Sequence, residues 1–260
     1  MCYSDGVDLM DPRILAAALF LPLFPLSMLF NVLFEGLRRP VPRVLVLIIW
    51  PQIGLWLLLG ANERPPGWVI HLALATSLLY GFRALVLREL THWISFLAIS
   101  SWAVLWLAAG YTNNLDTLRI LALGFSLPLG ILTLLGGLLK KQFGASYAGL
   151  YNGLGHAMPR FSGILVFTIL AVVATPVFPG FSTMTKAFLE STKGGMGGSV
   201  MLCLIWLTWG WAGARLIQGF VIGQENLEES EDLSFGLTWL YALLLVGLAV
   251  FGIYTLGQLS

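Results

Sequence analysis

The chain has 260 residues, of which 58% are hydrophobic and only 10% are charged. Its mean hydropathy of +0.85 excludes an ordinary water-soluble domain, in which about 25% of residues are charged. The formal net charge of +1 argues against nucleic-acid binding, which requires a basic patch to neutralise phosphates. We therefore expect an all-α membrane protein that contacts the lipid bilayer and has no nucleic-acid partner.

Apolar runs recur along the whole chain at about the 20-residue length needed to cross a bilayer. Eight can be delimited: Ile14–Phe34, Val44–Ala61, Trp68–Leu87, Trp93–Tyr111, Leu118–Leu139, the interrupted Phe161–Leu189, Ser199–Ile222 and Phe235–Leu256. The segments between them are short and carry charges, prolines or glycines, and no linker divides the chain. The sequence predicts about eight transmembrane helices in a single domain over residues 1–260.

Lysine and arginine are unevenly distributed over the connecting segments. The odd-numbered connections hold seven, Arg38, Arg39, Arg43, Arg88, Lys140, Lys141 and Arg160, whereas the even-numbered connections and the N-terminal segment hold four, Arg13, Arg64, Arg119 and Lys193. Basic residues are retained on the cytoplasmic side of a membrane. We therefore expect a multi-pass protein of the inner (plasma) membrane with both termini outside.

Two polar segments flank the apolar runs. The first run follows Asp5, Asp8 and Asp11, unlike the basic start of a signal peptide, so we expect it to be retained as a helix. The stretch from Gln224 to Asp232 is strongly acidic. It is interpreted as a solvated loop, with docking of a basic partner as the alternative.

The sixth run contains the helix-breaking residues Pro176, Pro179 and Gly180. Proline removes a backbone donor and clashes with the preceding helical turn, so this run should form a broken helix whose freed carbonyls are satisfied by neighbouring protein. Lys186 follows the break by six residues, and Glu190 lies one turn further on. Ionisable residues beside discontinuous helices are typical of ion-coupled transporters. The alternative is that Lys186 extends to the membrane interface at a helix end.

Few other residues could pass protons. His71 and His92 are candidate members of an ion relay, although each is also typical of an interfacial position near a helix end. Arg215 is expected to form a structural charge pair, because arginine stays protonated. The two cysteines, Cys2 and Cys203, lie far apart, and no cluster of Cys, His and Asp has metal-ligand spacing. We expect no metal, no cofactor and no catalytic residue.

Four stretches carry a family resemblance. They are Arg88-Glu-Leu-Thr-His-Trp-Ile-Ser-Phe-Leu-Ala-Ile-Ser100, the glycine-containing run from Leu121 to Lys141, Gly153-Leu-Gly-His-Ala-Met-Pro159 ahead of the interrupted run, and Arg215-Leu-Ile-Gln-Gly-Phe220 before the acidic segment. In order and spacing they resemble the antiporter-like subunits shared by respiratory complex I, Mrp-type Na⁺/H⁺ antiporters, membrane-bound hydrogenases and inorganic-carbon uptake complexes.

The chain departs from this family in two ways. Family members are commonly about twice as long, and the part that resembles this chain is mainly their C-terminal half. The lysine of the family's acid-Leu-Lys-Arg motif is Thr91 here, and the family's helix histidine is Gly124. Only Lys186 matches a family ionisable position.

The resemblance implies a row of buried Lys, His and Glu that passes protons along the membrane midplane. Burial disfavours the charged form of a lysine, which can then exchange its proton. Three hypotheses follow: an accessory subunit beside a full-length antiporter-like chain and a peripheral or soluble subunit, a structural or assembly subunit with no ion path of its own, or an independent transporter. An inorganic-carbon uptake complex is slightly favoured over a redox complex as the parent assembly.

Overall fold

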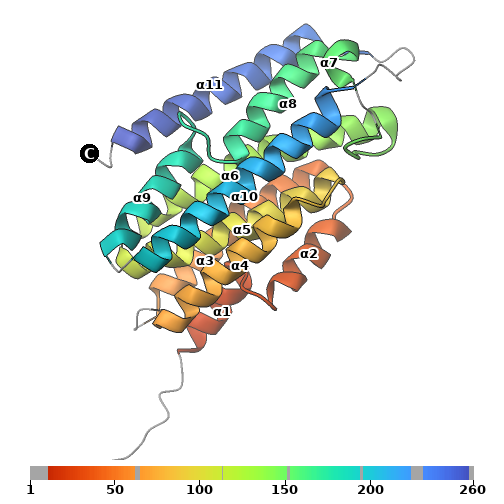
Figure 1. Ribbon diagram of the computed structural model, residues 1–260. Coiled ribbons are helices and arrows are strands. Elements are labelled where there is room, and N and C mark those ends of the chain that lie inside the picture. Colours follow the sequence, from red (N-terminus) through yellow and green to blue (C-terminus); the bar gives the residue numbers. More distant parts are fainter. Residues whose placement is uncertain are drawn as a thin grey trace, which may run out of the picture.

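The computed structural model describes residues 11–61, 65–112, 114–150, 153–193, 196–223 and 231–257, and every regular element within these ranges is a helix (Figure 1). The helices are α1 (Pro12–Phe20), α2 (Ser27–Gly36), α3 (Pro40–Leu59), α4 (Gly67–Ala84), α5 (Leu90–Tyr111), α6 (Leu115–Phe143), α7 (Leu154–Ala157), α8 (Pro159–Val172), α9 (Pro179–Lys193), α10 (Met196–Val221) and α11 (Phe235–Gly257). The expected all-α fold is confirmed.

The bundle is centred on α5 and α6. In the most apolar 18-residue window of each helix, 89% of the window is buried in α5 but only 22% in α11. Trp93, Trp102 and Trp106 of α5 have no exposed surface. The outer helices therefore turn apolar faces outward, as membrane-spanning helices do where lipid replaces water.

Among the described residues, five helices are long and apolar enough to cross a membrane, namely α3, α5, α6, α10 and α11. Of the other three predicted runs, one forms the 18-residue α4 and two are each divided into a pair of helices, α1 with α2 and α8 with α9. The five candidate spans among the described residues do not confirm the predicted number of about eight transmembrane helices.

The prediction of an unbroken helix over Ile14–Phe34 is wrong. α1 ends at Phe20 and α2 begins at Ser27. The cause is the pair Pro22 and Pro25, since neither residue has a backbone N–H and each ring obstructs the preceding turn. Two of the predicted runs are therefore interrupted within the described residues, and only the second interruption was expected.

Neighbouring helices satisfy the backbone groups that this first interruption frees. The indole Nε1 of Trp106 donates to the carbonyl of Leu21 at 3.0 Å, and the backbone N–H of Phe24 donates to Oγ1 of Thr76 at 3.2 Å. Gly54 of α3 lies so close that an added Cβ would be 2.8 Å from the Cγ of Leu21. Hydrogen bonds with α4 and α5 therefore replace missing helical ones, and α3 packs closely against the interruption.

Short connections join the end of α2 to the start of α3 and the end of α4 to the start of α5. These termini lie at one end of the bundle, together with the end of α6 and the start of α8 (Figure 1). The seven basic residues of the odd-numbered connections, Arg38, Arg39, Arg43, Arg88, Lys140, Lys141 and Arg160, occupy this region. We call it the basic end.

Candidate functional site

The predicted break at Pro176–Gly180 is present. α8 ends at Val172 and α9 begins at Pro179. Between them Ala174 and Val177 adopt positive φ values of 58° and 85°, a region that residues with a Cβ rarely occupy and that is especially unfavourable for a β-branched side chain. Such a conformation persists only where the surroundings enforce it.

Side-chain donors satisfy the carbonyls around this break. The hydroxyl of Thr175 donates to the Leu170 carbonyl at 2.9 Å, and the indole of Trp206 donates to the Ala174 carbonyl at 3.2 Å. These bonds meet the requirement that polar backbone at membrane depth be paired within the protein. Both interrupted helices thus use an indole N–H from a neighbouring helix to cap a carbonyl at the break.

Two glycines, one on α11 and one on α6, allow these helices to pack closely against the break. An added Cβ at Gly252 of α11 would lie 2.1 Å from the carbonyl oxygen of Val177, and one at Gly124 of α6 would lie 3.3 Å from Pro179. Gly124 is the position at which the family resemblance leads one to expect a histidine. A histidine side chain there would contact Pro179 at the start of α9.

Lys186 and Glu190 lie one turn apart on α9, and both are half-buried. Lys186 stands about two turns beyond the break, beside the buried face formed by Thr183 and Ala187. The ion pairs found among the described residues involve Glu35, Glu89, His92, Asp116 and Arg119, and Lys186 is not one of them. Lys193, the next cation, has a side chain outside the described part of the structure.

The remaining relay candidates lie on other elements. His71 is exposed near the start of α4, where its Nδ1 is 2.7 Å from the carbonyl of Gly67. His92 lies in the first turn of α5, at the basic end. Arg215 is exposed on α10 and shares a surface cavity of about 420 Å³ with Arg88. The structure therefore does not join these residues to Lys186.

His92 bridges two carboxylates. Its Nε2 is 2.9 Å from Oε1 of Glu35 at the end of α2, and its Nδ1 contacts Oε2 of Glu89 just before α5. The pairing with Glu89 follows from a three-residue spacing visible in the sequence, but the pairing with Glu35 depends on tertiary packing. This cluster ties the end of the first interrupted helix to the start of α5.

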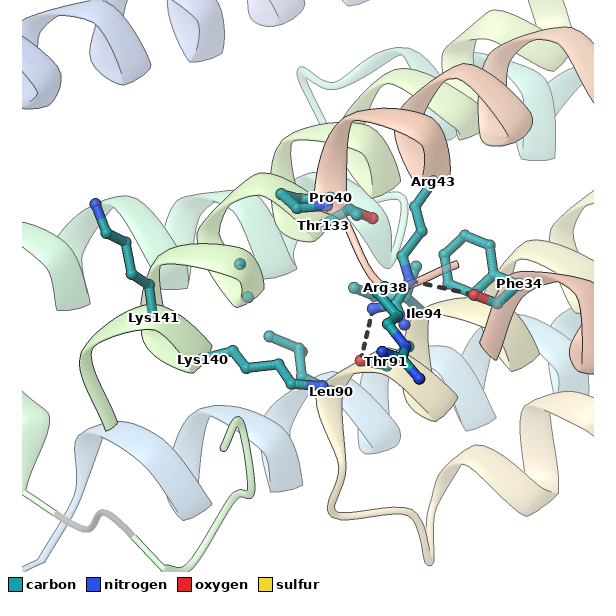
Figure 2. A pocket seen from close by; sticks show the side chains of 12 residues that line it. Phe34, Arg38, Pro40, Arg43, Leu90, Thr91, Ile94, Thr133, Lys140 and Lys141 are labelled. Atoms are coloured by element: carbon teal, nitrogen blue, oxygen red, sulfur yellow. Dashed lines mark hydrogen bonds between the residues drawn. The ribbon is translucent and has the colours of Figure 1, made fainter. Parts of the chain in front are cut away.

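A basic cavity of about 250 Å³ opens beside this cluster, and it was not predicted. Its lining residues are Phe34, Arg38, Pro40, Arg43, Leu90, Thr91, Ile94, Thr133, Gly136, Gly137, Lys140 and Lys141 (Figure 2). The lining includes four cations and two hydroxyls, and none of these described residues is acidic. We refer to it as the basic cavity.

Arg43 is fixed in the basic cavity by its hydrogen bonds. Its Nε donates to the carbonyl of Phe34 at 3.2 Å and its Nη1 to Oγ1 of Thr91 at 3.2 Å, as the dashed lines in Figure 2 show. Thr91 is the position of the family's lysine. The resemblance would place a cation on α5 at residue 91. In this chain Arg43 of α3 supplies a cation next to that position instead.

Within the described ranges, no group of three or more His, Cys, Asp or Glu side chains could hold a metal ion. Cys203 is a free, exposed cysteine on α10. Cys2 lies outside the described residues, as do Asp5, Asp8 and most of the acidic stretch. Of that stretch, Glu231 and Asp232 are described, and the Asp232 carboxylate accepts hydrogen bonds from the backbone N–H groups of Arg160 and Phe161 at 3.0 and 3.1 Å.

Solved structures share this arrangement of helices. A chain of respiratory complex I from Thermus thermophilus superposes with a TM-score of 0.82 at 20% identity, over 93% of this chain and 54% of that one. A chain of the Mrp complex from Dietzia sp. DQ12-45-1b gives 0.81 at 13% identity, over 95% of this chain and 56% of that one. The present chain has their fold.

A third similar structure is a chain of the membrane-bound sulfane sulfur reductase, an archaeal respiratory membrane complex, with a TM-score of 0.79, 18% identity, and coverage of 93% of this chain and 51% of that one. The chain thus spans about half the length of the solved chains it matches. No family model matches the sequence. An uncharacterized protein of Aquifex aeolicus (strain VF5) is 26% identical over 230 residues, which is 85% of this chain and 90% of that protein.

Proposed function

We propose that this chain is a membrane subunit of a complex that translocates protons or other cations. The observation that carries the proposal is the interrupted helix α8–α9, with half-buried Lys186 about two turns past the break, in a fold shared with subunits of complex I and Mrp complexes. In this proposal the chain crosses the inner membrane eight times, counting each interrupted pair as one crossing, and both termini lie outside.

The chain contributes at most one segment of an ion path. A proton relay needs successive titratable groups linked through water, and the positions of His71 and His92 leave Lys186 and Glu190 as a pair on α9. Buried hydroxyls lie near the break, including Ser182 of α9, which is 2.8 Å from Thr255 of α11. A relay through Lys186 would continue in a neighbouring protein. We therefore propose an accessory role beside a full-length antiporter-like chain, together with a peripheral or soluble subunit.

For the parent assembly we propose an inorganic-carbon uptake complex driven by proton flux. The second candidate is a structural or assembly subunit of an NADH–quinone oxidoreductase or hydrogenase-type complex, with no ion path of its own. The separation of His71 and His92 from Lys186 favours this second candidate, because a scaffold does not require the titratable groups to meet.

Gentle solubilisation followed by affinity capture of the tagged chain at its native expression level tests the proposal. Recovery of a long antiporter-like chain with a peripheral subunit supports the accessory role. A zinc subunit that hydrates CO₂ would identify carbon uptake, whereas flavin, iron–sulfur or nickel subunits would identify a redox complex. Recovery of the chain alone, in a form that moves ions in liposomes, would contradict the accessory role.

A further inference from the structure

We propose that the basic cavity binds the phosphate group of an anionic phospholipid. The cavity lies at the basic end, where α2 and α6 end and α3 and α5 begin. This inference goes beyond the proposed function and requires only that the chain be embedded in a membrane. It can therefore fail while the translocation proposal stands, and the reverse also holds.

The charge of the cavity selects an anion. Arg38, Arg43, Lys140 and Lys141 line it without an acidic residue among the described lining. The carboxylate of Glu35 lies outside this lining and contacts His92 at 2.9 Å, but it is close enough to act electrostatically on Arg43. Clusters of cations at a membrane surface attract anionic headgroups, and each basic residue strengthens the attraction.

The cavity is preorganised to receive that anion. Arg43 is held by the carbonyl of Phe34 and by Oγ1 of Thr91, so its guanidinium loses little freedom when an anion binds. Figure 2 shows Lys140 extending toward Thr91 and Arg38, whereas Lys141 turns away from them. Arg38 and Lys140 are both exposed, and their side chains are accessible to a ligand.

Helix dipoles add to these charges. α3 has 20 residues and α5 has 22, and both begin at the cavity, so two positive helix ends face it. The last turn of α6 contributes the opposite, negative end, which Lys140 and Lys141 offset. The cavity therefore combines four side-chain cations with the starts of two helices.

The size and surroundings of the cavity favour a lipid over an enclosed metabolite. Its volume of about 250 Å³ is below the range of roughly 300–1,000 Å³ typical of pockets that enclose drug-sized ligands. An exposed apolar stripe on α3 starts next to Pro40 of the cavity. It consists of Val41, Leu45 and Ile49, at successive helical turns, each more than half exposed. A phosphate in the cavity would allow acyl chains to follow this apolar stripe.

Labelling of Lys140 tests the assignment. The full-length chain is reconstituted into vesicles of phosphatidylcholine, with or without phosphatidylglycerol, and reacted with a water-soluble amine reagent. Mass spectrometry of the Lys140 peptide then gives the labelling rate. We expect phosphatidylglycerol to slow labelling several-fold, and Arg38→Gln to weaken the apparent lipid affinity about fivefold.

Arg39→Gln is the matched control. Arg39 lies next to Arg38 and is also exposed, but it does not line the cavity, and its side chain makes no capping bond to α3. This variant should retain the protection of the unmodified chain. Equal loss in both variants would show a general surface-charge effect and overturn the proposal.

A second arm separates the lipid from free phosphate. Inorganic phosphate is titrated into phosphatidylcholine vesicles with the same labelling readout, and we expect no protection of Lys140. Protection by inorganic phosphate equal to that by phosphatidylglycerol would instead assign the cavity to a soluble anion. Native mass spectrometry of Lys140→Gln, with loss of retained phosphatidylglycerol as the expected result, provides a readout independent of labelling.

Discussion

Gly252 of α11 lies directly against the carbonyl of Val177, in the interruption between α8 and α9. An added Cβ at Gly252 would be 2.1 Å from this oxygen and 2.8 Å from the backbone nitrogen of Pro179. The obstructing atoms are backbone, so no side-chain rotation could relieve the contact. The last helix therefore fits the break only because residue 252 has no side chain.

Gly252→Ala should destabilise the fold. The added methyl forces α11 away from the break, and overpacking of this kind typically costs about 1–3 kcal/mol. The midpoint of unfolding in detergent, followed by circular dichroism, measures the change. Gly247→Ala on the same helix is the control, because no atom lies within 4 Å of an added Cβ there. An equal effect of both substitutions would refute the role of this contact.

Trp206→Phe should also weaken the break, for a different reason. It keeps an aromatic ring but leaves the carbonyl of Ala174 without its donor at 3.2 Å, and an unsatisfied buried polar group costs about 1–3 kcal/mol. Trp211→Phe, on the same helix and 60% exposed, should be neutral. The same unfolding midpoint compares the two variants. Stability of Trp206→Phe equal to that of the unmodified chain would mean that another group satisfies this carbonyl.

Glu35→Gln should have only a small effect on stability. The pair between Glu35 and His92 is about 40% exposed on each side, and exposed ion pairs contribute about 0–1 kcal/mol. The change should shrink further at high salt, because screening weakens exposed pairs. Asp116→Asn, which alters a contact of 4.0 Å to Arg119, should be neutral. A loss of more than about 2 kcal/mol in Glu35→Gln would show that the cluster has a larger structural role.

The sequence predicts the second interruption because the effect of proline on a helix is local. Pro176 and Pro179 remove donors regardless of what packs around them. The paired prolines Pro22 and Pro25 carry the same local signal for the first interruption, whereas the single prolines Pro51 and Pro128 lie inside the continuous helices α3 and α6. The partners that satisfy each break could not be predicted, because Trp106 and Trp206 reach it only through helix packing.

The basic cavity was missed for the same reason. Arg38 and Arg43 are separated from Lys140 and Lys141 by about a hundred residues, and packing of α3 against α6 brings them together. One signal was available, since all four residues belong to the odd-numbered connections that predict a cytoplasmic side. Charge distribution alone indicates the end of the bundle at which they lie, but not the cavity.

Substitution of Lys186 tests the central proposal most directly. The complex captured with the native chain is reconstituted into liposomes, and proton movement is followed with an internal pH-sensitive dye. Lys186→Gln removes the exchangeable proton. Lys186→Arg keeps the positive charge, but an arginine cannot release its proton near neutral pH. Arg39→Gln, at an exposed residue that does not line the basic cavity, is the control. We predict that both Lys186 variants lower proton flux at least tenfold while the complex stays assembled and the control is unaffected. Unchanged flux in an assembled complex containing Lys186→Gln would contradict an ion path through this chain.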